Sequence, residues 1–301
     1  MKKLAIVGLL MIFAGVFLMK QDDIDTLIKS YFEPSVKEIE LGDKNAYYRD
    51  YDFLFVQNTT NFSPSNEQDI MNIYYTIINA GKDKFTFYCP QEYKNCIKDI
   101  KKIAEDQTKL SDINNYVHPY NGFANIKTEY DSLGKVTVYI SKTYTDDEIA
   151  VIDKKVDEIY KELATSLDTY TNIRNIHDFI IKNTRYDSDR SDSNLVQYKS
   201  DTAYGPLFQG YALCGGYTDL MELFLERLKV KSYKISSEEH IWNAVEFNGV
   251  WYHLDLTWDD PVVSDGTEFL EHTYFMIDTN TLQTVEKTQH NFNNTRYKEF
   301  N

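Results

Sequence analysis

The second half of the chain carries a thiol, an imidazole and a carboxylate in succession, at Cys214, His240 and Asp255. A thiolate is a nucleophile, an imidazole can take and return its proton, and a carboxylate fixes the tautomer of the imidazole and stabilises its charged form. The three residue types therefore predict covalent catalysis through a cysteine. The competing interpretation of Cys214 is a buried free cysteine, which is a common fate of this residue type.

An apolar stripe with helical spacing follows the cysteine and predicts a helix over residues 217–228. Cys214 would then lie at or just before the helix N-terminus, where the helix dipole and the free N–H groups favour the thiolate. Gly215 and Gly216 would leave the backbone uncovered there, so another chain could approach closely.

The histidine and the aspartate fall on a predicted β-hairpin. Asn248-Gly249 is a strong signal for a tight turn between two alternating segments, which we expect to be strands. A two-residue turn places Asp255 opposite Trp242, so His240 and Asp255 become diagonal neighbours on one face, about 7 Å apart or less at Cβ.

The other face of this hairpin is predicted to pack on the core. Its residues are Val245, Phe247, Val250, Tyr252, Leu254 and Leu256. His253 shares the face of Asp255 and is a rival to His240 as the catalytic base, because spacing alone does not separate the two. Asp255 could also be a solvated carboxylate on a strand.

The sequence around these residues resembles the transglutaminase-like core of papain-type thiol enzymes, most closely the secreted or membrane-tethered bacterial members. The matching motifs are Ala203-Tyr204-Gly205-Pro206-Leu207, Cys214-Gly215-Gly216-Tyr217, His240-Ile241-Trp242-Asn243 and Trp251-Tyr252-His253-Leu254-Asp255-Leu256-Thr257-Trp258-Asp259-Asp260-Pro261. The similarity extends to Ile176-His177-Asp178-Phe179, Tyr186-Asp187 and Tyr274-Phe275-Met276 and covers about residues 170–280.

The resemblance implies an α+β fold in which a nucleophile helix packs on an antiparallel sheet, with Cys214, His240 and Asp255 as the catalytic triad. It favours His240 over His253, because the histidine of this family lies in a His-x-Trp-Asn motif. The chain departs from the family where Gly215 replaces the usual glutamine and Thr218 the usual small residue. These departures put specificity in doubt more than activity.

Composition limits the other classes of function. The chain has 301 residues, of which 42% are apolar and 15% aromatic, enough for a packed core. Its net charge of −15 disfavours nucleic acid and anionic membrane surfaces as partners. Neither a zinc-binding spacing nor a P-loop is present, so we expect no cofactor and no metal.

Lys2 and Lys3 precede an uncharged apolar run, so residues 1–20 are interpreted as a signal peptide or an uncleaved membrane anchor, the anchor being favoured. Either predicts that the rest of the protein is exported, and that this segment is its contact with the membrane. Residues 21–45 are interpreted as a stalk, 46–145 as a small α/β N-terminal domain and 146–301 as the catalytic domain.

Within the N-terminal domain we expect strands over 51–57 and 84–88, helices over 66–79 and 92–105, and a hairpin formed by 117–130 and 135–143. No chemistry is evident there, and packing support is favoured over a binding role. Helices are predicted over 146–167 and 172–183, a loop over 187–201 and a strand over 272–277. Cys89 and Cys96 could form a disulfide in an exported protein, or remain two free thiols.

Several further residues have both a functional and a structural interpretation. Gln209 could donate to an oxyanion, although its match to that role is loose. His177 is interpreted as a structural hydrogen-bonding residue, and His272 and His290 as surface or strand residues without a catalytic role. Three aromatic residues near the triad could line a substrate channel, but buried packing is favoured. These are Tyr217, Trp242 and Trp258.

The sequence thus predicts an exported cysteine-dependent acyl-transfer enzyme that acts on a protein or peptide substrate, with cell-wall proteins among the candidates. Hydrolysis of peptide or amide bonds is favoured, and protein cross-linking by attack of an amine is the alternative. A non-catalytic protein-binding module, or a docking function of residues 46–145, would be different classes of protein.

Overall fold

A long helix that begins at Cys214 packs against a three-stranded antiparallel sheet in the second half of the chain. The helix is α9 (Cys214–Arg227), and the strands are β6 (Ser232–Ser236), β7 (Ile241–Phe247) and β8 (Val250–Leu254), in the order β6-β7-β8. Leu220, Met221 and Phe224 of the helix meet Val245 and Leu254 of the sheet in one buried cluster. Burial of these apolar side chains holds the helix on the sheet.

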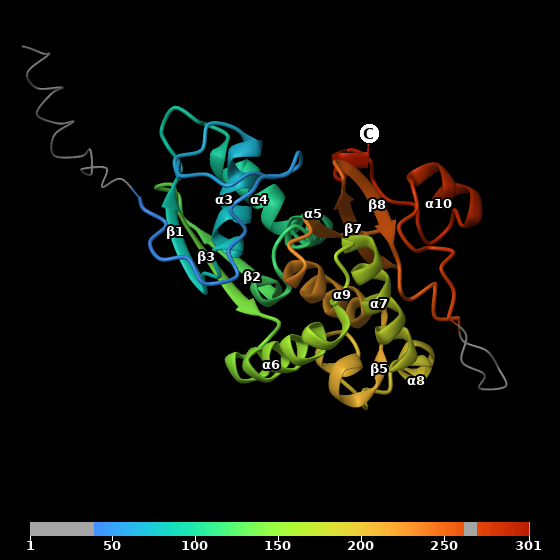
Figure 1. The fold of residues 1–301 in the computed structure, drawn as a ribbon. Coiled ribbons are helices and arrows are strands. Elements are labelled where there is room, and N and C mark those ends of the chain that lie inside the picture. Colours follow the sequence, from blue (N-terminus) through green and yellow to red (C-terminus); the bar gives the residue numbers. More distant parts are fainter. Residues whose placement is uncertain (1–38, 262–269, 301) are drawn as a thin grey trace, which may run out of the picture. The chain divides into compact units, whose positions relative to one another are not determined.

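The computed structural model describes residues 39–261 and 270–300, drawn in colour in Figure 1. The expected signal peptide or anchor over 1–20 and most of the expected stalk lie outside the described residues. Residues 41–301 belong to one compact unit. No helix among the described residues is long and apolar enough to cross a membrane. The boundary expected near residue 146 stays a prediction.

The register of the β7–β8 hairpin is the one that the turn predicts. Asn243 pairs with Leu254, and Phe247 pairs with Val250. Asn248 and Gly249 have φ values of 54° and 77°, the positive values that a two-residue turn of this kind requires. Strand β8 ends at Leu254, so Asp255 lies just beyond the sheet.

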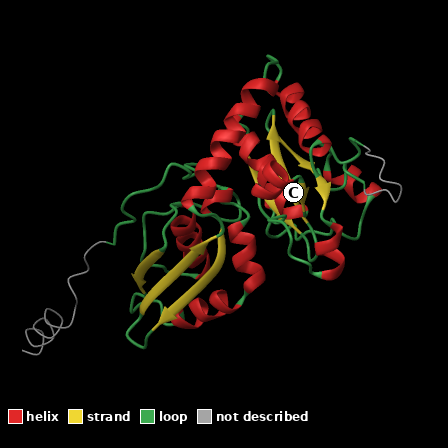
Figure 2. Cartoon of the chain, turned by 90° about the horizontal axis from the view of Figure 1, so that it is seen from below, coloured by secondary structure: helices red, strands yellow, loops and turns green. Residues whose placement is uncertain are grey.

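The first half of the chain contains a second antiparallel sheet with helices packed on it, as Figure 2 shows. Its strands are β1 (Lys84–Tyr88), β2 (Phe123–Tyr130) and β3 (Lys135–Lys142), in the order β1-β3-β2, and its helices are α3 (Glu67–Asn79), α4 (Cys96–Glu105) and α5 (Gln107–Asn114). The two antiparallel sheets and their helices make the protein an α+β structure. The expectation had not included α5.

Helices connect and flank the two sheets. They are α6 (Asp146–Leu163), α7 (Thr169–Lys182), α8 (Ser188–Ser193) and α10 (Thr279–Val285), with short helical turns at Pro119–Asn121, Gly205–Gln209 and Lys298–Phe300. A two-stranded parallel pair, β4 (Arg185–Tyr186) and β5 (Tyr211–Ala212), lies before α9. The segment over 187–201, expected to be a loop, therefore contains the short helix α8.

Two expected strands are absent from the described residues. Residues 51–57 are irregular, although Phe53, Phe55 and Val56 are buried. Side chains replace a strand ladder here: Asn58 donates to the carbonyl of Tyr51, and the side chain of Asn72 accepts from the amide of Gln57. Residues 272–277 form a single isolated bridge from Ile277 to His253 instead of a strand.

The C-terminal segment covers the face of the hairpin that carries Trp242 and His253. The ring of Phe300 stacks on His253 at 4.1 Å between centroids, and Phe292 packs against both Trp242 and His253. Both faces of the hairpin are therefore buried where the site lies, although the sequence predicted only one core face.

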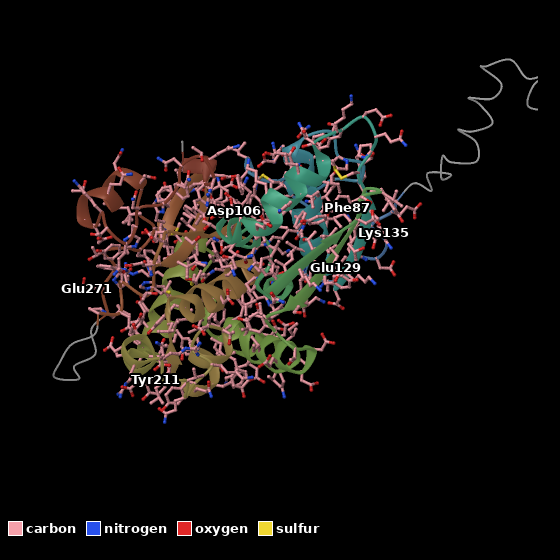
Figure 3. The ribbon with its side chains drawn as sticks, turned by 180° about the vertical axis from the view of Figure 1, so that it is seen from behind. Phe87, Asp106, Glu129, Lys135, Tyr211 and Glu271 are labelled. Carbon is pink, nitrogen blue, oxygen red and sulfur yellow. A yellow bond between two sulfur atoms is a disulfide. The ribbon has the colours of Figure 1, made fainter. Side chains whose placement is uncertain are left out.

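Cys89 and Cys96 form a disulfide, which settles the alternative that the sequence left open. In Figure 3 the yellow bond between sulfur atoms lies near the labelled Phe87, at the end of β1. The bridge links the end of β1 to the start of α4. Cys214 is a free cysteine and is partly exposed.

Candidate active site

Cys214 is the first residue of α9, as its position before the apolar stripe predicts. The first N–H groups of a helix have no intrahelical partner and carry the positive end of the dipole, so they favour a thiolate at this point. The segment around Ser200 crosses this first turn, and the amide of Leu213 donates to the carbonyl of Ser200. A Cβ on Gly216 would lie 2.2 Å from that carbonyl oxygen, so the close crossing requires glycine.

His240 and Asp255 are in direct contact. Nε2 of His240 lies 2.5 Å from Oδ2 of Asp255, and both side chains are buried. The other carboxylate oxygen, Oδ1, accepts from the amides of Thr257 and Trp258, which fixes the orientation of the carboxylate. The contact with Asp255 occupies Nε2 of His240, so Nδ1 is the ring nitrogen left for an interaction with the thiol.

The electrostatics join Cys214 to this pair. Burial by itself lowers the pKa of His240, but the Asp255 carboxylate and, to a smaller extent, Cys214 outweigh burial and raise this pKa to about 10. Burial also opposes ionisation of Asp255, yet His240 and His290 hold its pKa well below the usual range. The arrangement therefore favours an ionised carboxylate beside a charged imidazole.

His253, the rival base, is engaged elsewhere. Its Nδ1 accepts from Nε1 of Trp242 at 3.0 Å, and its Nε2 lies 3.1 Å from the hydroxyl of Thr279. Burial and the neighbouring His290 lower the pKa of His253 to about 3, so the ring is neutral at ordinary pH. A neutral imidazole with both nitrogens occupied is poorly placed to serve Cys214.

His290 belongs to the site, and the expectation of a surface or strand residue is wrong for it. It is buried outside any strand, and its Nε2 lies 2.8 Å from the same Asp255 oxygen that contacts His240. Glu286 holds the other ring nitrogen at 2.9 Å. Asp255 thus serves two histidines. No sequence pattern signals this contact, because His290 lies far along the chain in a segment without regular spacing.

Thr218, one of the departures from the family pattern, connects the helix to the strand that follows His240. Its hydroxyl lies 2.7 Å from the carbonyl oxygen of Cys214 and 3.1 Å from that of Ile241. Asn243 makes a parallel connection, since its amide donates to the carbonyl of Thr218 and to Glu222. These bonds fix the distance between the first turn of α9 and β7.

The first half of the chain contacts the same helix through buried polar groups. Arg49 forms a buried ion pair with Glu222. The hydroxyl of Tyr144 donates to Asp219 at 2.6 Å, and Lys234 lies 3.0 Å from that carboxylate. These contacts hold α9 through polar groups that are buried inside the protein.

The remaining candidates are involved in packing or hydrogen bonds. The side-chain carbonyl of Gln209 accepts from the amide of Lys199. Tyr217 and Trp242 are buried in the protein, the first bonded to Asp260 and the second stacked beside His240. His177 is a buried hydrogen-bonding residue, as expected, and forms a second cluster with Asp178 and His272.

No family model matches the chain, and no curated protein does. Among solved structures, the chain is similar to one described as a transglutaminase, at 11% identity and a TM-score of 0.34, over 45% of this chain and 44% of that one. A candidate cysteine protease from Cytophaga hutchinsonii is similar at 14% identity and a TM-score of 0.28, over 48% and 65%. The chain thus spans less than two thirds of either structure.

Proposed function

We propose that the protein is an exported thiol enzyme of the transglutaminase-like class that hydrolyses peptide or amide bonds with Cys214, His240 and Asp255. The observation that carries this proposal is the direct contact of buried His240 with Asp255, which together with Cys214 raises the pKa of His240 to about 10. Cysteine enzymes require an imidazole that is held in one orientation and charged beside the thiolate.

The proposed reaction has two steps. The Cys214 thiolate attacks the carbonyl carbon, and the charged His240 gives its proton to the leaving amine as the C–N bond breaks. Water then attacks the thioester while His240 takes a proton from it, which releases the acid and restores the thiolate. The backbone N–H of Cys214, at the helix N-terminus, is a donor for the oxyanion.

Protein cross-linking is the second candidate, because an amine in place of water would complete the same cycle by transamidation. A non-catalytic binding role predicts instead that Cys214 is inert. His290 is a positioning residue in this proposal: it contacts Asp255 and helps to keep the carboxylate ionised.

The test is the reactivity of Cys214 in the full-length protein. Iodoacetamide labelling is followed by mass spectrometry at pH 6, where an ordinary thiol is almost entirely protonated. We expect rapid labelling of Cys214 that slows strongly in His240→Ala but not in His253→Gln. Peptide cleavage and incorporation of a labelled amine are then measured on the same preparations. Slow labelling that is unchanged in His240→Ala would contradict the enzyme proposal and favour a binding role.

A further inference from the structure

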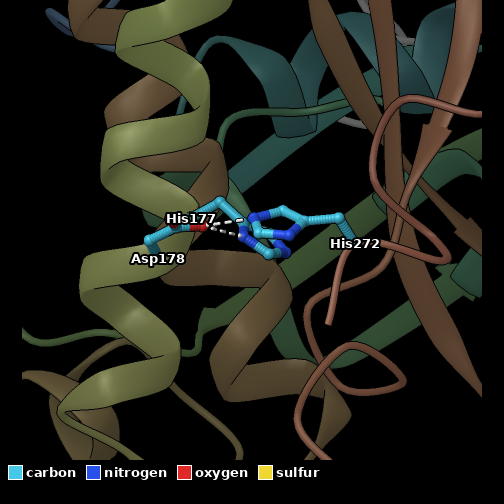
Figure 4. A group of neighbouring side chains, drawn as sticks. All are labelled: His177, Asp178 and His272. Atoms are coloured by element: carbon cyan, nitrogen blue, oxygen red, sulfur yellow. Dashed lines mark hydrogen bonds and ion pairs between the residues drawn. The ribbon is translucent and has the colours of Figure 1, made fainter. Parts of the chain in front are cut away.

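A second cluster of metal-ligating side chains lies outside the candidate active site. His177 and Asp178 belong to α7, and His272 belongs to the segment before α10 (Figure 4). Nδ1 of His177 lies 3.0 Å from Oδ1 of Asp178, and Nε2 of His272 lies 2.7 Å from the same oxygen. The three possible ligand atoms are within 4.8 Å of one another.

We propose that these three residues form a binding site for a divalent transition metal, with Zn²⁺ the best fit. Two imidazoles and one carboxylate are the ligand set that suits zinc and disfavours calcium and magnesium, which prefer oxygen ligands. The ligands come from two segments that are far apart in the sequence, so no spacing motif could predict the site.

The surroundings of His177 support the proposal independently. Its second nitrogen, Nε2, lies 3.1 Å from Oδ2 of the fully buried Asp259. Metal-binding histidines commonly donate their second N–H to a carboxylate, which fixes the ring orientation and strengthens the ligand. Asp259 is itself held, because its other oxygen accepts from the amide of Tyr274.

Access to solvent distinguishes this cluster from the one at the active site. The side chains of Asp178 and His272 are 24% and 27% exposed, so an ion could enter and keep a water as a further ligand. The cluster at the active site is almost fully buried, and its Asp255 already contacts the rings of both His240 and His290. A metal bound at the partly exposed cluster would join α7 to the segment that contains His272.

The test uses the full-length Cys214→Ser protein, because this change removes the thiol that could otherwise bind the metal. Chelator-treated protein is titrated with Co²⁺, followed by its visible absorption, and then with Zn²⁺ in competition. We expect one ion per chain. His272→Ala and Asp178→Asn should each lose this binding, and Asp259→Asn should weaken it by about 10- to 100-fold.

His290→Gln is the matched control, since it removes one of the two histidines of the other cluster, and it should keep the full affinity. Circular dichroism establishes that each variant is folded, and His272 is a suitable position because its side chain is partly exposed. The proposal is overturned if the Cys214→Ser protein shows no saturable binding of either ion. It is also overturned if binding survives both His272→Ala and Asp178→Asn, or if His290→Gln abolishes it.

Discussion

Two clusters in the second half of the chain contain the same residue types, two histidines and an aspartate, in different environments. In the first, Asp255 lies between His240 and His290, all three are buried, and a thiol interacts with one ring. In the second, Asp178 lies between His177 and His272 and part of the group faces solvent. Burial and the neighbouring nucleophile make the first suited to proton transfer, whereas access to solvent makes the second suited to a bound ion.

The rate of peptide hydrolysis should differ most between the two clusters when the aspartate of each, Asp255 or Asp178, is replaced by asparagine. Asp255→Asn should reduce the rate of peptide hydrolysis by about 10³- to 10⁴-fold, because an amide neither stabilises charged His240 nor fixes its tautomer. Asp178→Asn should leave this rate unchanged. The measurement is kcat/KM on a cleaved peptide, with folding checked by circular dichroism. Equal losses in both variants would mean that the two clusters act as one unit.

Replacement of His290 in the first cluster and of His272 in the second should give a smaller difference in the rate of hydrolysis. His290→Gln removes a charge-assisted contact with Asp255, and such a bond is worth about 1.5–3 kcal/mol, so hydrolysis should fall by about 10- to 100-fold. The loss should appear in kcat, and the pH range over which kcat is high should become narrower. Both effects are expected of a residue that acts through Asp255. His272→Gln is the matched control and should change neither quantity. An unaltered pH profile in His290→Gln would leave His290 with a packing role alone.

The features that the sequence predicted correctly, the hairpin register and the start of α9, are determined by residues close together in the chain. Asn248-Gly249 sets a turn with positive φ, and the turn fixes the register that brings His240 near Asp255. The start of α9 follows from its apolar stripe. His290 could not be predicted in the same way, because its contact with Asp255 depends on how the C-terminal segment folds back over the hairpin.

The irregular segment over 51–57 shows a different limit. Its apolar residues suggested a strand, and Phe53 and Val56 are indeed buried. However, its backbone groups find side-chain partners: Asn58 donates to the carbonyl of Tyr51, and Asn72 of α3 accepts from the amide of Gln57. The apolar residues of this segment predicted that its side chains are buried. Whether its backbone pairs with another strand or with side chains depends on residues from other elements.

The pH dependence offers a way to separate the roles of thiol and imidazole in the first cluster. The pKa of His240 in the folded protein, about 10, lies above the ordinary value of 6.5, so its charged form stabilises the fold fully below pH 6.5. This contribution is lost as the pH rises through about 10. Hydrolysis should decline there, because neutral His240 cannot protonate the leaving amine, whereas alkylation of Cys214 should not decline. A parallel decline of both rates would show unfolding instead.

The smallest effect concerns the stability of the second cluster without metal. His272→Ala removes a 2.7 Å contact with Asp178, but both side chains are about a quarter exposed. Solvent screening reduces such a contact, so we expect a loss of about 1 kcal/mol in the free energy of unfolding by urea. Lys127→Ala, which breaks a surface ion pair with Glu129, is the control and should not change the urea midpoint.

Added Zn²⁺ should enlarge the difference between the original protein and His272→Ala, because an ion that binds only the folded state stabilises it by about 2.7 kcal/mol at 100 times its Kd. The comparison is best made in the Cys214→Ser background, where the thiol does not compete for the ion. A loss well above 3 kcal/mol without metal would mean that His272 is required for the fold itself. The partly exposed cluster would then stabilise the fold as buried groups do. In that case the proposed difference in role between the partly exposed and the buried cluster would be wrong.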